Sequence, residues 1–278
     1  MFTVHFVVNI PMIPIKDIRN LIIDMDGVLW LGDQPMPTLN SFFDTLRALK
    51  IKFVLATNNA SKSGNEYVAK LRKFGVNVAV EEILTSPQAT ALYLAQHAPD
   101  ARVFVIGEPG LGEELRAKNL RVVNDEPQTA THVVVGIDRT LTYAKLVEAC
   151  LLIRAGATFI GTNPDVTFPD ARGVVPGNGA ILAALRVSTD VEPTIIGKPQ
   201  REMMIQSMAR MGGTPADTAV IGDRLDTDIL GGVNAGLTTL MVLSGISTRH
   251  EAETGDIHPD YIFEDIGEIG AMLNEVLK

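Results

Sequence analysis

Residues 21–30 read Leu21-Ile22-Ile23-Asp24-Met25-Asp26-Gly27-Val28-Leu29-Trp30, an apolar run that ends abruptly in two carboxylates and a glycine. A run that is apolar on both faces is typical of a central strand in a parallel sheet. Asp24 and Asp26 would then lie at its carboxyl end, where open α/β sheets bind their ligands. Two such close acids repel each other unless a cation lies between them or one keeps its proton. The stretch predicts a metal site, an acid/base pair or both; the alternative is a simple turn that leaves a strand.

The composition is that of an acidic globular protein. The chain has 278 residues, of which 46% are hydrophobic and 21% charged, and its formal net charge is −9. It has no run rich in lysine and arginine, so we expect no nucleic-acid partner, because phosphate-backbone binding needs clustered positive charge. No segment approaches the roughly 18 to 20 apolar residues of a membrane span, so we expect no membrane partner either. The length suits one large or two medium domains.

The single cysteine and the amino-terminal segment bear on location and assembly. Cys150 has no partner for an internal disulfide, which fits a reducing compartment and predicts the cytoplasm. Residues 1–11 are apolar but have neither a cationic start nor a small-residue cleavage site, so we expect no signal peptide. We expect residues 1–14 to form an extra strand or arm. A neighbouring copy of the chain could hold this arm, so a homodimer is a possible assembly.

Strand-like and helix-like segments alternate along most of the chain, which predicts βαβ units, a parallel sheet and therefore an α/β fold. Strands are expected at 21–24, 53–56, 102–106, 132–135, 157–160, 194–197, 219–222 and 239–243, and helices at 39–50, 65–74, 111–118, 143–154, 180–186, 202–211 and 228–234. The pattern starts afresh after about residue 86. We therefore expect a core domain, 1–86 and 192–278, interrupted by an inserted α/β domain, 87–191, with Pro87 and Pro193 at the seams.

Polar residues follow four strands that we assign to the core domain. Because the carboxyl ends of parallel strands lie on one side of a sheet, these groups are expected to meet in one crevice. Clustered hard oxygen ligands favour Mg²⁺. A lysine, a hydroxyl and backbone N–H groups beside them suit a phosphoryl group, whose transfer depends on positioning and charge neutralisation. The four groups, in chain order, are Asp24 and Asp26; Thr57, Asn58 and Asn59; Lys198; and Asp223, Asp226 and Asp228.

The two acids of the first group differ in their expected chemistry. Asp24 lies at the strand tip and is the candidate nucleophile, because an ionised carboxylate can attack phosphorus. Asp26 lies further along the turn and is the candidate general acid/base. It would protonate the leaving oxygen and later take a proton from water.

Four ordered motifs resemble those of the haloacid dehalogenase (HAD) superfamily, and most closely those of its subfamily IIA, the NagD-like, 4-nitrophenylphosphatase-type branch. The Thr-Asn-Asn triplet and the Gly-Asp-Arg-Leu-Asp-Thr-Asp string are the most branch-specific features, and the resemblance runs from Ile15 onward. It implies a Rossmann-like HAD core with an inserted C2-type cap and a Mg²⁺-dependent phosphatase that works through an aspartyl-phosphate. The motifs are Asp24–Leu29, Thr57–Asn59, Gly197–Pro199 and Gly222–Asp228.

The resemblance also implies a role for each motif residue. Asp24 would be the nucleophile and a metal ligand, and Asp26 the general acid/base and, through its backbone carbonyl, a second metal ligand. Asp223 would be the direct metal ligand of the last motif, with Asp228 as a supporting acid. Thr57, with Asn58, corresponds to the phosphate-binding motif, and Lys198 to the lysine that steadies nucleophile and phosphate.

Several of these positions also have a simpler structural interpretation. Thr57 could cap a helix at the end of its strand, and Lys198 could be a surface lysine. Asp226 and Asp228 could be first-turn acids that complement a helix dipole, and for Asp226 we favour that interpretation.

The inserted domain contains a second candidate region. In similar phosphatases the loop after Asn-Pro-Asp faces the active site and selects the leaving group. Residues 165–172 would suit a compact, partly apolar leaving group; the alternative is a structural loop rich in Pro and Gly. The predicted substrate-binding residues are Asn58, Asn59, Asp165, Val166, Thr167 and Phe168.

The sequence thus predicts a Mg²⁺-dependent phosphatase whose partner is a small phosphorylated metabolite. Related scaffolds cleave sugar phosphates, nucleotides, phosphoglycolate and aryl phosphates. The alternative is a non-catalytic metal- or metabolite-binding module on the same fold, which would have no need of Asp26 as an acid/base. An oxidoreductase is not expected, because no dinucleotide-binding fingerprint is present.

Overall fold

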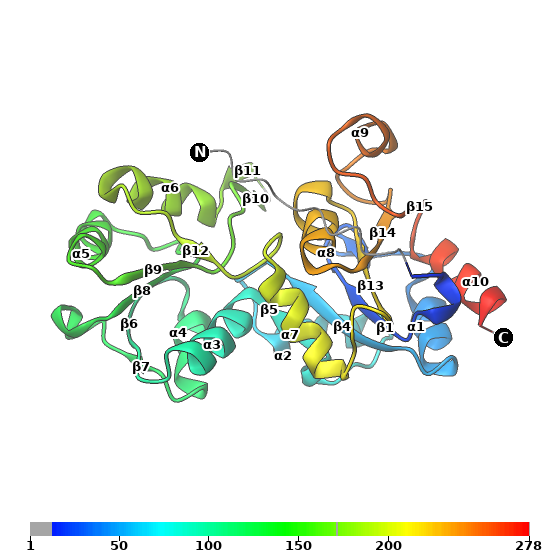
Figure 1. Ribbon diagram of the computed structural model, residues 1–278, viewed down its shortest axis with the longest axis horizontal. Coiled ribbons are helices and arrows are strands. Elements are labelled where there is room, and N and C mark those ends of the chain that lie inside the picture. Colours follow the sequence, from blue (N-terminus) through cyan, green and yellow to red (C-terminus); the bar gives the residue numbers. More distant parts are fainter. Residues whose placement is uncertain (1–12, 171, 278) are drawn as a thin grey trace.

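Two parallel sheets occupy opposite halves of the molecule in the computed structural model, which describes residues 13–170 and 172–277, with the backbone alone at 168–170 (Figure 1). The larger sheet has six strands in the order β15 (Tyr261–Phe263), β14 (Thr238–Val242), β13 (Thr218–Gly222), β1 (Asn20–Ile23), β4 (Lys52–Thr57) and β5 (Ile83–Thr85). The smaller sheet has five in the order β12 (Thr194–Ile195), β9 (Thr158–Gly161), β8 (His132–Val135), β6 (Arg102–Ile106) and β7 (Arg121–Val122). The α/β fold class predicted from the sequence is confirmed.

Ten α-helices within the described residues accompany these sheets. They are α1 (Leu39–Ala48), α2 (Gly64–Lys73), α3 (Ser86–His97), α4 (Pro109–Ala117), α5 (Tyr143–Arg154), α6 (Asn178–Thr189), α7 (Arg201–Met211), α8 (Leu230–Ala235), α9 (Arg249–Thr254) and α10 (Ile266–Val276). Short 3₁₀ turns lie at Ile15–Asp17, Val80–Glu82 and Pro127–Thr129, and a π-helical turn, Leu225–Ile229, leads into α8. Two antiparallel hairpins, β2 (Trp30–Leu31) with β3 (Gln34–Pro35) and β10 (Thr167–Asp170) with β11 (Gly173–Pro176), complete the fold.

The apolar run at the start of the chain forms the buried strand β1. All four of its residues are buried, and its side chains alternate between two cores. Leu21 and Ile23 belong to the cluster that includes Phe42 of α1, whereas Ile22 belongs to the cluster that includes Met203 and Met204 of α7. Side chains alternate between the two faces of a strand, so a central strand needs apolar residues at every position. This double burial holds the residues after Ile23 at the rim of the core.

The strand expected at 194–197 lies in a different sheet from the one predicted. We assigned it to the core with β1, β4 and β13, but β12 pairs with β9 of the five-stranded sheet, with Thr194 opposite Ile160. Only two residues form this strand, so its apolar pattern carried no information about its partner. The chain therefore changes sheets after Ile195, a few residues beyond the seam expected at 191–192, and the domain boundaries themselves stay predictions.

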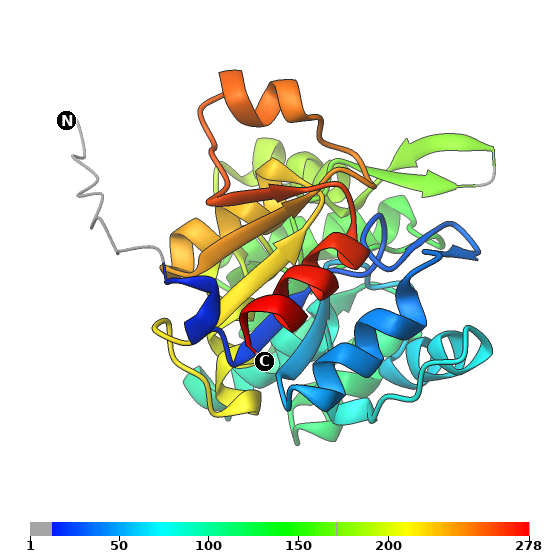
Figure 2. The same ribbon diagram turned by 90° about the vertical axis from the view of Figure 1, so that its right-hand side faces the viewer.

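The segment expected to be a loop at 165–172 contains a regular hairpin. Strand β10 pairs with β11, with Thr167 opposite Pro176, and the turned view shows this hairpin extending away from the sheets (Figure 2). The amino-terminal arm predicted at 1–14 falls almost entirely on residues 1–12, which lie outside the described residues. The homodimer inferred from that arm therefore stays a prediction.

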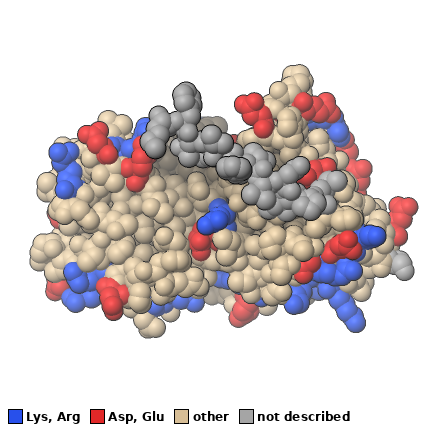
Figure 3. All heavy atoms as spheres, viewed as in Figure 1, with Lys and Arg blue, Asp and Glu red and all other residues tan. Residues whose placement is uncertain are grey.

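The surface charges and the lengths of the helices bear on the expected partners. On the face in Figure 3, lysine and arginine side chains alternate with acidic ones around the rim instead of joining into one basic patch. Among the described residues, no helix combines the length and the apolar composition needed to cross a bilayer.

Candidate active site

Three neighbouring strands of the larger sheet end at one edge and place polar residues there. In the parallel register, Ile23 of β1 lies opposite Leu55 of β4 and Ile221 of β13. Asp24 directly follows β1, and Asp223 directly follows β13. Residues about 200 positions apart in sequence are thereby brought to one rim, as parallel topology requires.

Three carboxylates meet at this rim. Asp24, Asp223 and Asp228 each offer an oxygen, and these oxygens all lie within 4.8 Å of one another. All three residues are buried, with exposed fractions of 9%, 1% and 1%. Burial raises the pKa of Asp24 well above its usual value, and the charges of Asp228 and Asp223 add to this effect while Lys198 opposes it. Such an arrangement of like charges needs positive charge close by.

Lys198 supplies part of that charge. Its Nζ donates hydrogen bonds to Oδ1 of Asp24 at 2.5 Å, to Oδ1 of Asp228 at 2.6 Å and to the carbonyl of Ala56 at 3.0 Å. Burial by itself would lower the pKa of Lys198, but the charges of Asp228 and Asp24 outweigh it and raise the pKa above its usual value. The ammonium therefore stays charged, and Lys198 is not the surface lysine of the simpler interpretation. It reaches the site from the connection between β12 and α7.

The two carboxylate oxygens of Asp223 differ in their hydrogen bonding. Its Oδ2 accepts a hydrogen bond from the backbone N–H of Ile246 at 2.8 Å, whereas its buried Oδ1 has no hydrogen-bond partner among the described residues. Burial, together with the charge of Asp228, raises the pKa of Asp223 to about 7. A buried carboxylate oxygen without a partner costs free energy unless a ligand satisfies it.

Two glycines let the backbone approach Asp223 closely. A Cβ built on Gly245 would lie 1.9 Å from Oδ2 of Asp223, and one built on Gly27 would lie 2.4 Å from the same atom. Gly27 also has a φ of +87°, which L-residues with a side chain rarely adopt. The hydroxyl of Ser244 donates a hydrogen bond to the Gly27 carbonyl at 2.7 Å, so the two glycine-containing turns are linked.

These groups fit a divalent cation of the hard, oxygen-preferring kind, such as Mg²⁺. The donor set consists of carboxylate oxygens, and the unpartnered Oδ1 of Asp223 is the group that such an ion would satisfy. Asp24 and Asp223 could hold the ion directly. Asp228, which we expected only as a supporting acid, lies in the same cluster.

Asp26 lies apart from this cluster. Its side chain is exposed, and Oδ1 accepts a hydrogen bond from Nε1 of Trp30 at 2.7 Å. The side-chain cluster therefore contains Asp228 and not the carboxylate of Asp26. The metal contact that the family resemblance implies for Asp26 is through its backbone carbonyl, and it stays a prediction.

The hydrogen bonds of Thr57 and Asn59 shape the turn that follows β4. Oγ1 of Thr57 accepts a hydrogen bond from the N–H of Asn59 at 3.0 Å. Oδ1 of Asn59 in turn accepts from both the N–H and the hydroxyl of Ser61, at 3.0 Å and 2.7 Å. Thr57 is buried and is followed by the turn, whereas α2 begins only at Gly64, so Thr57 caps no helix.

Asn58 connects this turn with the Lys198 segment and with the inserted region. Its side chain accepts from the N–H of Lys198 at 2.8 Å and donates to the Lys198 carbonyl at 2.9 Å. It also donates to Oδ1 of Asp165 at 3.1 Å. Its own carbonyl accepts from the hydroxyl of Ser86 at 2.7 Å and from Nδ2 of Asn163 at 2.9 Å. Sequence reasoning missed Ser86 and Asn163, although Asn163 opens the Asn-Pro-Asp segment that it did single out.

The predicted substrate-binding residues are only partly brought together. Asn58, Asn59, Asp165 and Thr167 line one small cavity of about 20 Å³ between the two halves of the chain. The Val166 side chain is 69% exposed and is not among the residues lining this cavity. The side chain of Phe168 lies outside the described part of the structure. Burial raises the pKa of Asp165, against the influence of Asn58 and the nearby cations.

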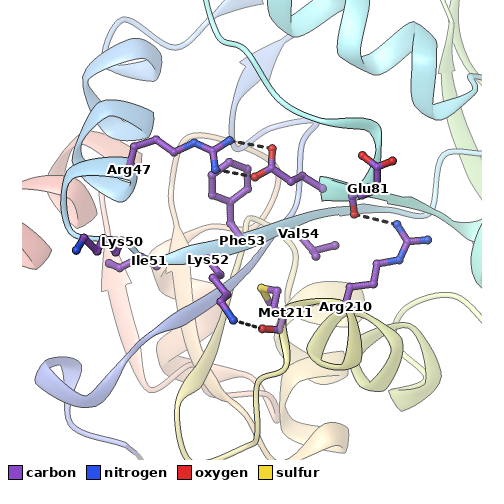
Figure 4. Close-up of a pocket in the computed structure, with 10 residues that line it drawn as sticks. Arg47, Lys50, Ile51, Lys52, Phe53, Val54, Glu81, Arg210 and Met211 are labelled. Carbon is purple, nitrogen blue, oxygen red and sulfur yellow. Dashed lines mark hydrogen bonds and ion pairs between the residues drawn. The ribbon is translucent and has the colours of Figure 1, made fainter.

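A larger cavity, of about 400 Å³, lies at the opposite end of β4 and is a poor candidate for chemistry (Figure 4). Three of the four cations that line it are engaged in structural contacts: Arg47 forms a two-point ion pair with Glu82, and Nζ of Lys52 donates to the Met211 carbonyl at 2.6 Å. Arg210 donates to the carbonyl of Ile83 at 2.6 Å and to that of Glu81 at 3.2 Å. These contacts join α1 and α7 to the Val80–Glu82 turn, and β4 to α7.

Comparison with known proteins agrees with the geometry of the acid cluster. A family model for haloacid dehalogenase-like hydrolases matches residues 21–121, and a HAD-hydrolase-like model matches residues 195–269. The acid sugar phosphatase of Staphylococcus aureus (strain USA300) is 38% identical over 260 residues, which cover 94% of this chain and 100% of that protein. The structure of 4-nitrophenylphosphatase from Thermotoga maritima superposes with a TM-score of 0.87 at 34% identity, over 96% of this chain and 99% of that one. Glycerol phosphate phosphatase from Mycobacterium tuberculosis, in complex with calcium, superposes with a TM-score of 0.83 at 37% identity, over 92% of this chain and 75% of that one. The chain therefore belongs to the haloacid dehalogenase-like hydrolases, in their branch of 4-nitrophenylphosphatase and NagD-type phosphatases.

Proposed function

We propose that this enzyme is a Mg²⁺-dependent phosphatase that hydrolyses small phosphomonoesters through an aspartyl-phosphate on Asp24. The observation that carries the proposal is the pairing of Lys198 with Asp24, beside the unpartnered oxygen of Asp223. A dianionic phosphoryl group needs cations around it, and Lys198 supplies one of them. Mg²⁺ held by Asp24 and Asp223 would supply the second positive charge.

In the first half of the reaction, a carboxylate oxygen of Asp24 attacks phosphorus and the bond from phosphorus to the ester oxygen breaks. Asp26 gives its proton to that departing oxygen, which leaves as an alcohol. In the second half, Asp26 takes a proton from water, whose oxygen attacks phosphorus and releases Asp24 and inorganic phosphate. Thr57 and the backbone N–H groups of its turn are proposed to hold the phosphoryl oxygens.

The proposed substrate class is a small phosphomonoester: a sugar phosphate, nucleotide, phosphoglycolate or aryl phosphate. Its leaving group would lie beneath the inserted region, where Asn58, Asn59, Asp165 and Thr167 line one cavity. Val166 and Phe168 of the β10 segment remain part of this proposal. The named relatives are an acid sugar phosphatase, a 4-nitrophenylphosphatase and a glycerol phosphate phosphatase, and these names support a small phosphomonoester as the substrate.

Phosphate release from a panel of phosphomonoesters, measured with and without Mg²⁺, tests the proposal. We expect release in the presence of Mg²⁺, its loss on chelation and its recovery when the ion is restored. Asp24→Asn removes the nucleophilic oxygen and is expected to lower kcat by at least about a thousandfold. Full activity of that variant, or undiminished activity after chelation, would contradict the proposal.

A further inference from the structure

Trp30 contacts the Asp26–Gly27 turn through both its backbone and its side chain. Its indole Nε1–H donates a hydrogen bond of 2.7 Å to Oδ1 of Asp26. Its carbonyl accepts a hydrogen bond of 2.8 Å from the N–H of Gly27, and an isolated β-bridge joins residues 26 and 30. A side chain that is otherwise exposed to water is thereby fixed at one of its two oxygens.

The indole is itself held firmly. Trp30 is fully buried, with an exposed fraction of 0%. Its ring stacks on Tyr67 with centroids 6.3 Å apart and contacts Phe74 at 6.0 Å. Nζ of Lys70, in α2, lies 4.2 Å from the centre of the indole ring and also donates to the carbonyl of Gly32 at 2.8 Å, which joins α2 to the β2–β3 hairpin. The packing of the indole therefore determines where its N–H points.

The geometry points to Trp30 as a positioning residue for proton transfer by Asp26, an inference that rests on the proposed function. With Oδ1 bound to the indole N–H, the second oxygen of Asp26 is the one free to give a proton to the departing ester oxygen. An exposed carboxylate without this hydrogen bond would sample several rotamers, and fixing it beforehand removes that entropy cost from the reaction. Trp30 itself touches no reacting atom.

The test compares two leaving groups that differ in how strongly their departure depends on protonation. 4-Nitrophenolate is a stabilised anion and leaves readily without protonation, whereas phenolate is more basic and depends more on an acid. The two phenyl phosphates are otherwise similar in shape. The measured quantity is kcat/KM, because it covers the steps up to the first release of alcohol.

Trp30→Phe keeps an aromatic ring against Tyr67 but removes the N–H. We expect it to lower kcat/KM for phenyl phosphate about tenfold more than for 4-nitrophenyl phosphate. Because Trp30 is the only tryptophan in the chain, it can also be replaced by its benzothiophene isostere, which keeps the ring shape without the donor. The isostere is expected to show the same selectivity between the two esters, and it keeps the test decisive if Trp30→Phe fails to fold.

Two controls separate positioning from packing. Phe74→Leu loosens the ring cluster but keeps the indole N–H, so it should affect both esters alike. In an Asp26→Asn background, Trp30→Phe should produce no further selectivity, because the group that it positions is gone. Equal losses for both esters in the isostere, or no loss at all, would overturn the inference.

The activity of Asp24→Asn separates a failure of the proposed function from a failure of the role proposed for Trp30. If that variant is inactive while the isostere keeps the wild-type ratio of the two esters, only the role of Trp30 is wrong. If the wild-type protein releases no phosphate from any phosphomonoester, both the proposed function and the role of Trp30 are wrong.

Discussion

Nζ of Lys198 lies 2.6 Å from Oδ1 of Asp228, and both side chains are almost completely buried, at 3% and 2% exposure. The same nitrogen lies 2.5 Å from Oδ1 of Asp24. A buried ammonium loses its water, so it keeps its charge only where acids compensate for that loss. Asp228 is thus the partner that holds Lys198 in position beside the candidate nucleophile.

Asp228→Asn tests this arrangement. The amide keeps an oxygen near Lys198 but loses the charge, so the ammonium is less well compensated and less well placed. We expect kcat to fall about tenfold to a hundredfold, as for residues that orient a metal or its ligands. Phosphate release from 4-nitrophenyl phosphate gives the measurement.

Asp226→Asn is the matched control, because Asp226 is two residues away and forms its ion pair with Arg224 near the surface. We expect that variant to stay within about twofold of wild type, in line with the small contribution of exposed ion pairs. Equal losses in the two variants would show that the charge of the segment matters and not the contact with Lys198.

The raised pKa of Asp223 links stability to pH and to metal. In the metal-free folded state this pKa is about 7, above the usual value of 3.8, so the folded protein binds a proton that the unfolded chain releases. Stability therefore falls as pH rises from about 4 through about 7, because the ionised carboxylate is disfavoured in the buried cluster. Burial raises the pKa of Asp24 in the same direction.

We expect Mg²⁺ to offset this loss. At about pH 8 the ion should raise Tm clearly, and at about pH 5 it should raise Tm much less, because a proton then competes for Asp223. Calorimetric scans with Mg²⁺ and with chelator at both pH values give the four Tm values needed. A metal-induced shift of equal size at both pH values would argue against Asp223 as a ligand.

Much of the fold follows from local patterns. The sequence pattern predicted Arg102–Ile106, His132–Val135 and Tyr143–Arg154, and the structure has these elements with the same bounds. Each is a continuous apolar run or has clear helical spacing, so its local pattern agrees with its burial. Strand β12 was predicted from its apolar pattern, but its sheet was not, and the β10–β11 hairpin was not predicted at all. Their pairing depends on partners elsewhere in the chain, as short extended segments commonly do.

The convergence of Asp24 and Asp223 also follows from reading which residues end the strands. Lys198 reaches the same site, but from the connection between β12 and α7 and not from a strand of the same sheet. The burial of Asp228 rather than Asp226 agrees with what the family resemblance implied, but it does not follow from the strand ends, because it depends on the local helix geometry. The segment Leu225–Ile229 forms a π-helical turn, which leaves Asp226 exposed and buries Asp228. A wider turn changes the face on which each residue lies, and the alternation of acids in the sequence cannot reveal it.

Gly245 provides a steric test of the metal site. A Cβ there would lie 1.9 Å from Oδ2 of Asp223, so Gly245→Ala must displace the carboxylate that the N–H of Ile246 holds. We expect the affinity for Mg²⁺ to fall about tenfold to a hundredfold, measured by titration calorimetry.

Gly110→Ala is the control for adding a methyl group to a glycine. Gly110 lies in α4, and a Cβ there would meet no atom within 4 Å. Alanine favours helix over glycine by up to about 1 kcal/mol, so this variant should be at least as stable as wild type and should bind Mg²⁺ normally. Unchanged affinity in Gly245→Ala would mean that Asp223 can move without loss, which would contradict its place as a ligand.

Variants of Asn58 and Asp165 can separate the positioning of Lys198 from the contact with the inserted region. Asn58→Ala removes two hydrogen bonds to the backbone of Lys198 and one to Asp165. A shift of about 1 Å in a reacting group costs about a hundredfold in rate, so we expect a fall of that order in kcat. The buried N–H and carbonyl of Lys198 would also lose their partners, at about 1–3 kcal/mol each in the free energy of unfolding.

Asp165→Ala removes the 3.1 Å hydrogen bond from Asn58 and the negative charge near Arg224, and it leaves the hydrogen bonds between Asn58 and Lys198 intact. Because Asp165 lines the small cavity between the two halves of the chain, its loss should raise KM for the substrate and change kcat by less than about tenfold. Steady-state kinetics on both variants with one phosphomonoester separate the two effects. If Asp165→Ala lowers kcat as far as Asn58→Ala does, then the contact across the cavity, and not the clamp on the Lys198 backbone, is what keeps the ammonium beside Asp24.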